Sequence, residues 1–208
     1  MGSDDIFKKQ RNARVSNKRD IKNKILIVCE GEKTEVNYLK EIRIEKRIPD
    51  KLVQIKNCSL GTNPKKVLEC AIKESGYKRG KFENFDEVWI VIDRDDHQDF
   101  AQTILEANSK NINVACSNPC FELWLLLHFE NQTAHIERQN VVSKLSKHMS
   151  YAKNMNSSYF ATKEKLQFAT ENAKKLILKH KIDCEKFDNC ECNPMTTMQE
   201  LVEKIINI

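Results

Sequence analysis

The chain has 208 residues, of which 40% are hydrophobic and 31% are charged, enough for one domain of ordinary size with a small appendage. No apolar run approaches the roughly 20 residues that span a bilayer. The first residues, MGSDDIFKK, lack the apolar core of a secretory signal. We therefore expect a cytoplasmic protein that is neither secreted nor embedded in a membrane.

The net charge of +5 is concentrated at the amino terminus. Residues 1–24 contain eight lysines and arginines against three aspartates, and the rest of the chain is balanced. We interpret residues 1–23 as a basic, flexible arm. Such an arm could hold a phosphate backbone through counterion release, or it could be a solvated terminus without a partner. Both interpretations stay open.

Apolar runs rich in β-branched residues alternate with helical patterns along the first two thirds of the chain. Four runs are expected to be strands: 24–29, 52–57, 87–92 and 112–116. Helical patterns follow each of them, including the strongly apolar CFELWLLLHF after the fourth. In the helix after the second strand, Thr62 or Asn63 suits the cap and Pro64 the first turn. This alternation predicts an α/β fold with a mostly parallel four-stranded sheet flanked by helices.

No strand is expected after about residue 135. Helical patterns cover 140–149, 163–181 and 196–206, with an irregular link at 150–160. We therefore expect an α/β domain over 24–135 and a helical extension over 136–208 that packs on it.

Three carboxylates follow two of the predicted strands directly. Glu30 comes after the first strand, and Asp93 and Asp95 come after the third. Functional groups of open α/β sheets gather beyond the carboxyl ends of the strands, so these acids converge if the two strands are neighbours. Crowded carboxylates repel one another without a cation, and hard oxygen ligands suit Mg²⁺ or Mn²⁺. For any single acid, a helix cap or a surface charge is the alternative.

The segments that contain these acids resemble a known family. ILIVCEGEKTEVNYL resembles the first Toprim motif, and VWIVIDRDD resembles its Asp-x-Asp motif. SNPCFELWLLLHF, YAKN at 151–154 and NPMTTMQELVEKI near the carboxyl terminus are similar to the RloB-like (AbiLii-like) branch of the Toprim family. The resemblance covers nearly the whole chain, apart from the basic arm and a cysteine-rich stretch at 184–192.

This resemblance implies a Toprim-like Rossmannoid fold with a divalent-metal site for phosphodiester chemistry. Toprim relatives include topoisomerases, primases and the nuclease halves of phage-defence systems, some of which cut tRNA. RloB-like proteins are often partnered with an ATPase, and this sequence has no phosphate-binding G-x-x-x-x-G-K-[ST] motif of its own. The implied function is a Mg²⁺- or Mn²⁺-dependent nuclease of an anti-phage or abortive-infection system, acting on DNA or RNA with a partner ATPase.

The resemblance also implies roles for individual residues. By motif matching, Asp93 and Asp95 bind the metal, while Glu30 is either a ligand or a general acid/base. Glu35 matches an extra acid of nuclease-type relatives and would be a further ligand. The alternative for Glu35 is a carboxylate placed at a helix start, where the helix dipole favours it.

Two further residues are candidate catalytic groups. Glu122 lies between Phe121 and Leu123, and a carboxylate in so apolar a stretch needs a partner or a metal. It would be a second ligand or an orienting group, with a first-turn helix acid as the alternative. Lys153 matches the Tyr-x-Lys pattern of the family and could reach the phosphate, although a surface lysine is the simpler interpretation.

Two other functions and one other metal remain open. One alternative is a non-catalytic Toprim module that binds nucleic acid or a partner. Another is a phosphatase of the haloacid dehalogenase type, whose Asp-x-Asp normally follows the first strand and not the third. A zinc site would need residues that lack paired C-x-x-C spacing: His180, Cys184, Cys190 and Cys192. Reduced thiols are expected instead, because no export signal favours disulfides.

Overall fold

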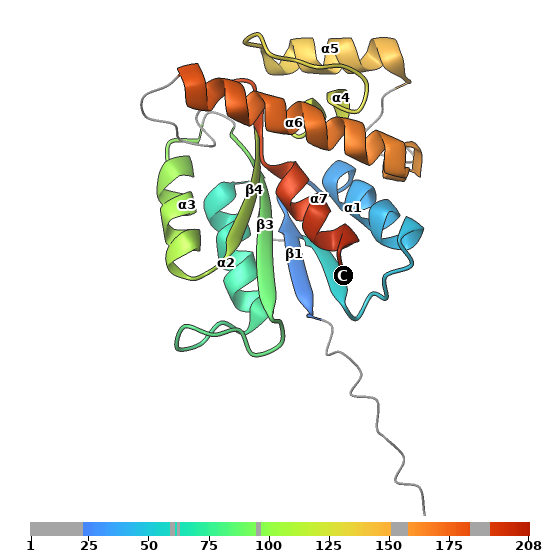
Figure 1. The fold of residues 1–208 in the computed structure, drawn as a ribbon. Helices are drawn as coiled ribbons and strands as arrows, with labels where there is room; N and C mark the ends of the chain where they lie inside the picture. Colours follow the sequence, from blue (N-terminus) through green and yellow to red (C-terminus); the bar gives the residue numbers. More distant parts are fainter. Residues whose placement is uncertain (1–22, 59–60, 62, 95–96, 151–157, 184–191) are drawn as a thin grey trace, which may run out of the picture.

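The computed structural model describes residues 23–58, 61, 63–94, 97–150, 158–183 and 192–208. Its centre is a five-stranded sheet in the order β2-β1-β3-β4-β5 (Figure 1). The strands are β1 (Ile25–Cys29), β2 (Val53–Asn57), β3 (Glu87–Asp93), β4 (Asn113–Asn118) and β5 (Met195–Thr196). The first four are parallel to one another, and β5 runs antiparallel to β4. The α/β class and the parallel arrangement are therefore confirmed.

The predicted number of four strands is wrong, because the short strand β5 was missed. Met195 and Thr196 are too few residues to show a period-two pattern. Side-chain hydroxyls help to hold this segment against β4: Ser117 Oγ and Thr196 Oγ1 lie 3.0 Å apart, and the Cys116 amide donates to Thr197 Oγ1 at 2.9 Å. Polar contacts to a distant strand, and not a local hydrophobic pattern, make this strand.

The helices largely follow the sequence expectation. They are α1 (Thr34–Glu45), α2 (Pro64–Ser75), α3 (Phe100–Ser109), α4 (Glu122–Leu126), α5 (Arg138–His148), the 3-10 helix η1 (Ser158–Ala161), α6 (Lys163–Asp183) and α7 (Met198–Ile206). Asn63 caps α2 by accepting from the Lys65 amide at 2.9 Å, and Gly76 ends it in the left-handed conformation at φ 65°. The apolar run after β4 forms only the five-residue helix α4.

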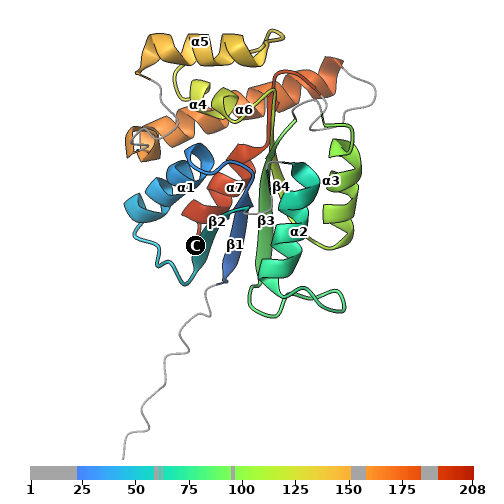
Figure 2. The same cartoon turned by 180° about the vertical axis from the view of Figure 1, so that it is seen from behind.

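Each face of the sheet has its own apolar cluster. Leu26 and Val28 of β1 point toward α2 and α3, whereas Ile25 and Ile27 point to the opposite side. Helices α2 and α3 cover the first face, and α1 and α7 cover the second (Figures 1 and 2). The second cluster also includes apolar residues of α4, α6 and η1. Residues after 136 therefore complete the core of that second face.

Helices α4, α5 and α6 lie over the carboxyl ends of the parallel strands (Figure 1). The long helix α6 runs across this end, and α5 lies outside it. Within the part of the chain that the structure describes, no helix has the length and apolarity to cross a bilayer.

The cysteines only partly behave as expected. Cys29, Cys58 and Cys70 are buried and form no disulfide, as expected of cysteines that act as small hydrophobic residues. Cys116 is equally buried but disulfide-bonded, contrary to the expectation of reduced thiols. His180 contacts the Pro194 carbonyl oxygen through Nε2 at 2.8 Å. Cys184 and Cys190, two of the three cysteines of the candidate zinc site at His180, lie outside the described residues, so that site stays untested.

Candidate metal centre

Two of the predicted acids meet at the ends of neighbouring strands. Strand β1 pairs directly with β3, with Cys29 opposite Val91. The Glu30 amide continues this ladder by donating to the Val91 carbonyl at 3.0 Å. Glu30 Oε2 in turn accepts a hydrogen bond from the Asp93 amide at 3.0 Å. The condition on which the sequence prediction depended, that these strands are neighbours, is therefore met.

Glu35 reaches the same place from the first turn of α1. An added Cβ at Gly31 would lie only 2.0 Å from Glu35 Oε2 and 2.4 Å from Glu35 Oε1. Any larger residue at position 31 would therefore displace this carboxylate. The glycine between the strand and the helix allows Glu35 to fold back against the chain that carries Glu30.

Glu122 arrives from a third direction, as the first residue of α4 after β4 has ended. Its neighbours Phe121 and Leu123 are fully buried, and Glu122 is itself only 8% exposed. The Cys120 thiol donates a hydrogen bond to Glu122, and burial together with this carboxylate raises the pKa of Cys120. The Cys120 thiol is therefore one partner of the kind expected for a carboxylate in this apolar stretch.

These acids line one cavity of about 630 Å³ at the carboxyl end of the sheet. All four are more than nine-tenths buried: Glu30, Glu35, Asp93 and Glu122. Glu30 follows β1 directly, and the others come from α1, β3 and α4, which are separated in sequence but meet at this cavity. Lys33, His97 and Arg138 supply the positive or neutral nitrogen groups of the lining.

Asp93 is the carboxyl group on which the crowding of this cavity acts most clearly. Burial raises the pKa of Asp93 well above its usual range, and the carboxylates of Glu35, Glu122 and Glu30 raise it further. The Arg138 guanidinium lowers the pKa of Asp93, but it is the smallest of these influences. The site therefore carries more negative charge than its own basic groups neutralise.

Arg138 is the site residue that sequence reasoning missed. It is the first residue of α5, and its Nη2 lies 3.1 Å from Asp93 Oδ2. The one local signal is that the first turn of α5 contains no acid and starts with a cation. The helix dipole disfavours a cation at that position, but the N-cap Glu137 places an acid directly beside it, so this signal alone does not point to Asp93.

The other predicted residues are not placed. Asp95 and Lys153 both lie outside the described residues, and their roles stay predictions. Among the residues that are described, no three histidine, cysteine, aspartate or glutamate side chains are grouped closely enough to hold a metal ion as they stand. The four carboxylates thus surround a common space without forming a closed ligand shell.

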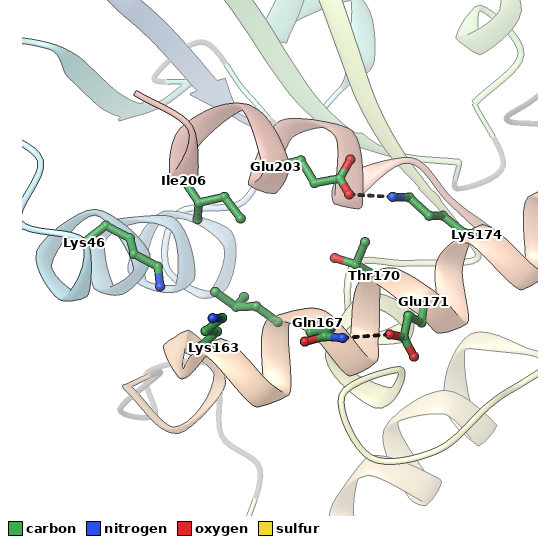
Figure 3. Close-up of a pocket in the computed structure, with 9 residues that line it drawn as sticks. Lys46, Lys163, Gln167, Thr170, Glu171, Lys174, Glu203 and Ile206 are labelled. Carbon is green, nitrogen blue, oxygen red and sulfur yellow. Dashed lines mark hydrogen bonds and ion pairs between the residues drawn. The ribbon is translucent and has the colours of Figure 1, made fainter.

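A second hollow, of about 310 Å³, lies between α1, α6 and α7 (Figure 3). Two of its charged groups form an ion pair, with Lys174 Nζ 2.6 Å from Glu203 Oε1. Gln167 donates to Glu171 at 3.0 Å on the same wall (Figure 3). The crowded, buried carboxylates of the first cavity distinguish it from this one as the candidate site.

Comparison with known proteins gives one result. No curated protein and no solved structure matches the chain. The family model described as RloB-like protein matches residues 25–205, from the first strand to the last helix. The match covers every element that contributes an acid to the cavity. This chain is a member of the RloB-like family.

Proposed function

We propose that this protein is a divalent-metal-dependent nuclease that cleaves phosphodiester bonds in DNA or RNA. The observation that carries the proposal is the convergence of four buried carboxylates on one cavity, with the pKa of Asp93 raised by the other three. Buried like charges are costly unless a cation offsets them. A fold that maintains such an arrangement is best explained by a bound cation.

The chemistry of the donors suits Mg²⁺ or Mn²⁺, because carboxylate oxygens are the ligands that these hard ions prefer. Asp93, Glu30 and Glu35, together with Asp95, would hold the ion. A bound ion of this kind polarises the scissile phosphate and stabilises the charge of the transition state. Glu122 would orient the ligands from α4.

Glu30 has a second role available. Its Oε2 accepts a hydrogen bond from the Asp93 amide at 3.0 Å, and a carboxylate held at the cavity in this way can exchange a proton with water or a leaving group. Either role, ligand or general acid/base, requires a carboxylate at this position.

We also propose that the nuclease acts in anti-phage defence or abortive infection under the control of a partner ATPase. Membership of the RloB-like family and the Toprim motif resemblance support this part. Cellular RNA, including tRNA, and phage DNA are the substrates to compare.

The test is a cleavage assay with purified protein on DNA, total RNA and tRNA. It is run with Mg²⁺, Mn²⁺ or EDTA, with and without the partner ATPase. Glu30→Gln and Asp93→Asn should each reduce cutting at least about a hundredfold. Glu69→Gln, an exposed acid of α2 on the other face of the sheet, is the matched control and should cut normally.

Cutting by Asp93→Asn at the wild-type rate would indicate a contaminating nuclease and would overturn the proposal. If the protein binds nucleic acid but cuts it under none of these conditions, the alternative of a non-catalytic binding module is favoured.

A further inference from the structure

Arg138 is the basic side chain of the cavity that contacts Asp93, and none of the roles proposed above uses it. Its Nη2 lies 3.1 Å from Asp93 Oδ2. The Asp93 side chain is only 10% exposed, whereas the Arg138 side chain is 48% exposed. The guanidinium therefore bridges the buried carboxylate and the solvent-filled mouth of the cavity.

The chain segment before Arg138 is held in place from two sides. The Ile136 amide donates to Asn193 Oδ1 at 3.0 Å, and the Ile136 carbonyl accepts from Asn193 Nδ2 at 3.1 Å. Ile136 and Val141 also pack in an apolar cluster with Cys120, Leu123 and Leu126 around α4. Because α4 carries Glu122, the same packing unit places both Glu122 and Arg138 at the cavity.

The position of this cation is costly for the helix itself. Arg138 begins α5, where the helix dipole disfavours positive charge. The N-cap Glu137 is an adjacent acid that contacts His135, and Asp93 adds a buried carboxylate from another element. A guanidinium recognises phosphate oxygens with the same forked geometry as it recognises a carboxylate. The group that now binds Asp93 is thus equally suited to a phosphate.

We propose that Arg138 is a phosphate-binding residue that holds Asp93 in the metal-free protein and turns to a backbone phosphate of the nucleic acid when a divalent cation engages Asp93. Asn193 is its positioning residue, through the backbone of Ile136. The inference rests on the proposed nuclease function and adds the group that recognises the substrate backbone. Arg138 and a metal ion then compete for the same carboxylate in the absence of nucleic acid.

The first test measures Mn²⁺ binding by calorimetry without nucleic acid. Arg138→Gln should bind Mn²⁺ about three- to tenfold more tightly than wild type, because the competing cation is gone. Lys147→Gln makes the same charge change at an exposed position near the other end of α5 and should leave Mn²⁺ affinity unchanged. Unchanged or weaker Mn²⁺ binding by Arg138→Gln would contradict the proposal.

The second test measures binding of a fluorescein-labelled single-stranded RNA, and of the DNA with the same sequence, in the presence of Mn²⁺. Glu30→Gln serves as the background so that the probe stays intact. Adding Arg138→Gln should lower affinity for the preferred probe about tenfold. It should also reduce the slope of log affinity against log salt by about 0.7 to 0.9. Adding Lys147→Gln should change neither quantity.

Asn193→Ala tests the positioning role. It should weaken probe binding less than Arg138→Gln does, while leaving the salt slope at the wild-type value, because the charge is still present. Circular dichroism and a thermal melt establish that each variant is folded.

The outcomes separate the two proposals. Wild-type protein that neither binds Mn²⁺ nor cuts would overturn the nuclease proposal and the role of Arg138 with it. Wild-type protein that binds Mn²⁺ and cuts, with Arg138→Gln equal to wild type in both binding tests, would overturn the role of Arg138 alone.

Discussion

The two faces of the sheet are built from different parts of the chain. The cluster beneath α2 and α3 uses residues between Leu26 and Cys116, so it is local in sequence. The cluster beneath α1 and α7 uses residues from Ile25 to Ile205. The elements that bring Glu35 and Glu122 to the cavity, α1 and α4, belong to this second cluster. Packing on one face therefore supports stability alone, whereas packing on the other also positions the acids.

Paired core truncations give the largest expected effect and test this comparison directly. Leu68 of α2 and Leu39 of α1 are both fully buried, one on each face. Each Leu→Ala change should lower the free energy of unfolding by about 2–5 kcal/mol in urea titrations. Only Leu39→Ala should also weaken Mn²⁺ binding, because α1 carries Glu35. Equal loss of Mn²⁺ affinity in both variants would show that the two faces do not differ in how they position the acids.

Glu122→Gln tests the contribution of α4, which carries the last of the four acids in the sequence. The change keeps the size of the side chain but removes its charge. Mn²⁺ affinity should fall about 10- to 100-fold, as for other groups that orient ligands. The thermal midpoint without metal should rise, since one of the charges that raise the pKa of Asp93 is removed. A lower metal-free midpoint with unaltered Mn²⁺ affinity would instead make Glu122 a structural residue.

Two buried titratable groups, His128 and Asp93, should give opposite pH dependences of stability. Burial lowers the pKa of His128 from 6.5 to about 3, so its contribution to stability is complete above pH 6.5 and declines toward pH 3. The slope should approach about 1.4 kcal/mol per pH unit. The raised pKa of Asp93 has the opposite effect: stability from this group is present below pH 3.8 and is lost as the pH rises.

Thermal melts of metal-free protein across this pH range separate the two groups. His128→Gln should flatten the acid side of the stability profile, and Asp93→Asn should flatten the decline toward neutral pH. Mn²⁺ should suppress the Asp93 effect and leave the His128 effect in place. Identical profiles for wild type and both variants would show that neither group controls the pH dependence.

Gly31→Ala gives the smallest expected effect. The new methyl group cannot share space with the Glu35 carboxylate, which would lie 2.0 Å away. Mn²⁺ affinity should fall by up to about tenfold as Glu35 is displaced. The double variant Gly31→Ala/Glu35→Ala should bind Mn²⁺ no more weakly than Glu35→Ala alone. A further loss in the double variant would mean that Gly31 acts on the site by another route.

The parts of the fold that the sequence predicted are those with local patterns. Continuous β-branched runs marked the parallel strands, and the acids directly after two of these strands marked the site. Asn63, one of the two residues expected to cap the helix after the second strand, caps α2 through its own side chain. In these places the structure depends on residues that are close in sequence, and a single sequence contains the necessary information.

The features that were missed depend on contacts between distant segments. The run from Cys120 to Leu127 is buried on all sides, so it has no amphipathic period from which the short length of α4 could be read. Strand β5 depends on hydroxyl contacts to β4, and the place of Arg138 depends on how α5 packs against α4. The roles of Asp95 and Lys153 remain predictions.

The two-residue strand β5 also affects when the site can form during protein synthesis. Met195 and Thr196 pair with the end of β4, and Asn193 just before them anchors the backbone of Ile136. All four acids of the cavity are translated long before these residues. A chain that has been made only up to α5 therefore contains every residue that lines the cavity but lacks Asn193, the anchor of the backbone before Arg138. The acids and their arginine would reach their final arrangement only after β5 has paired with β4.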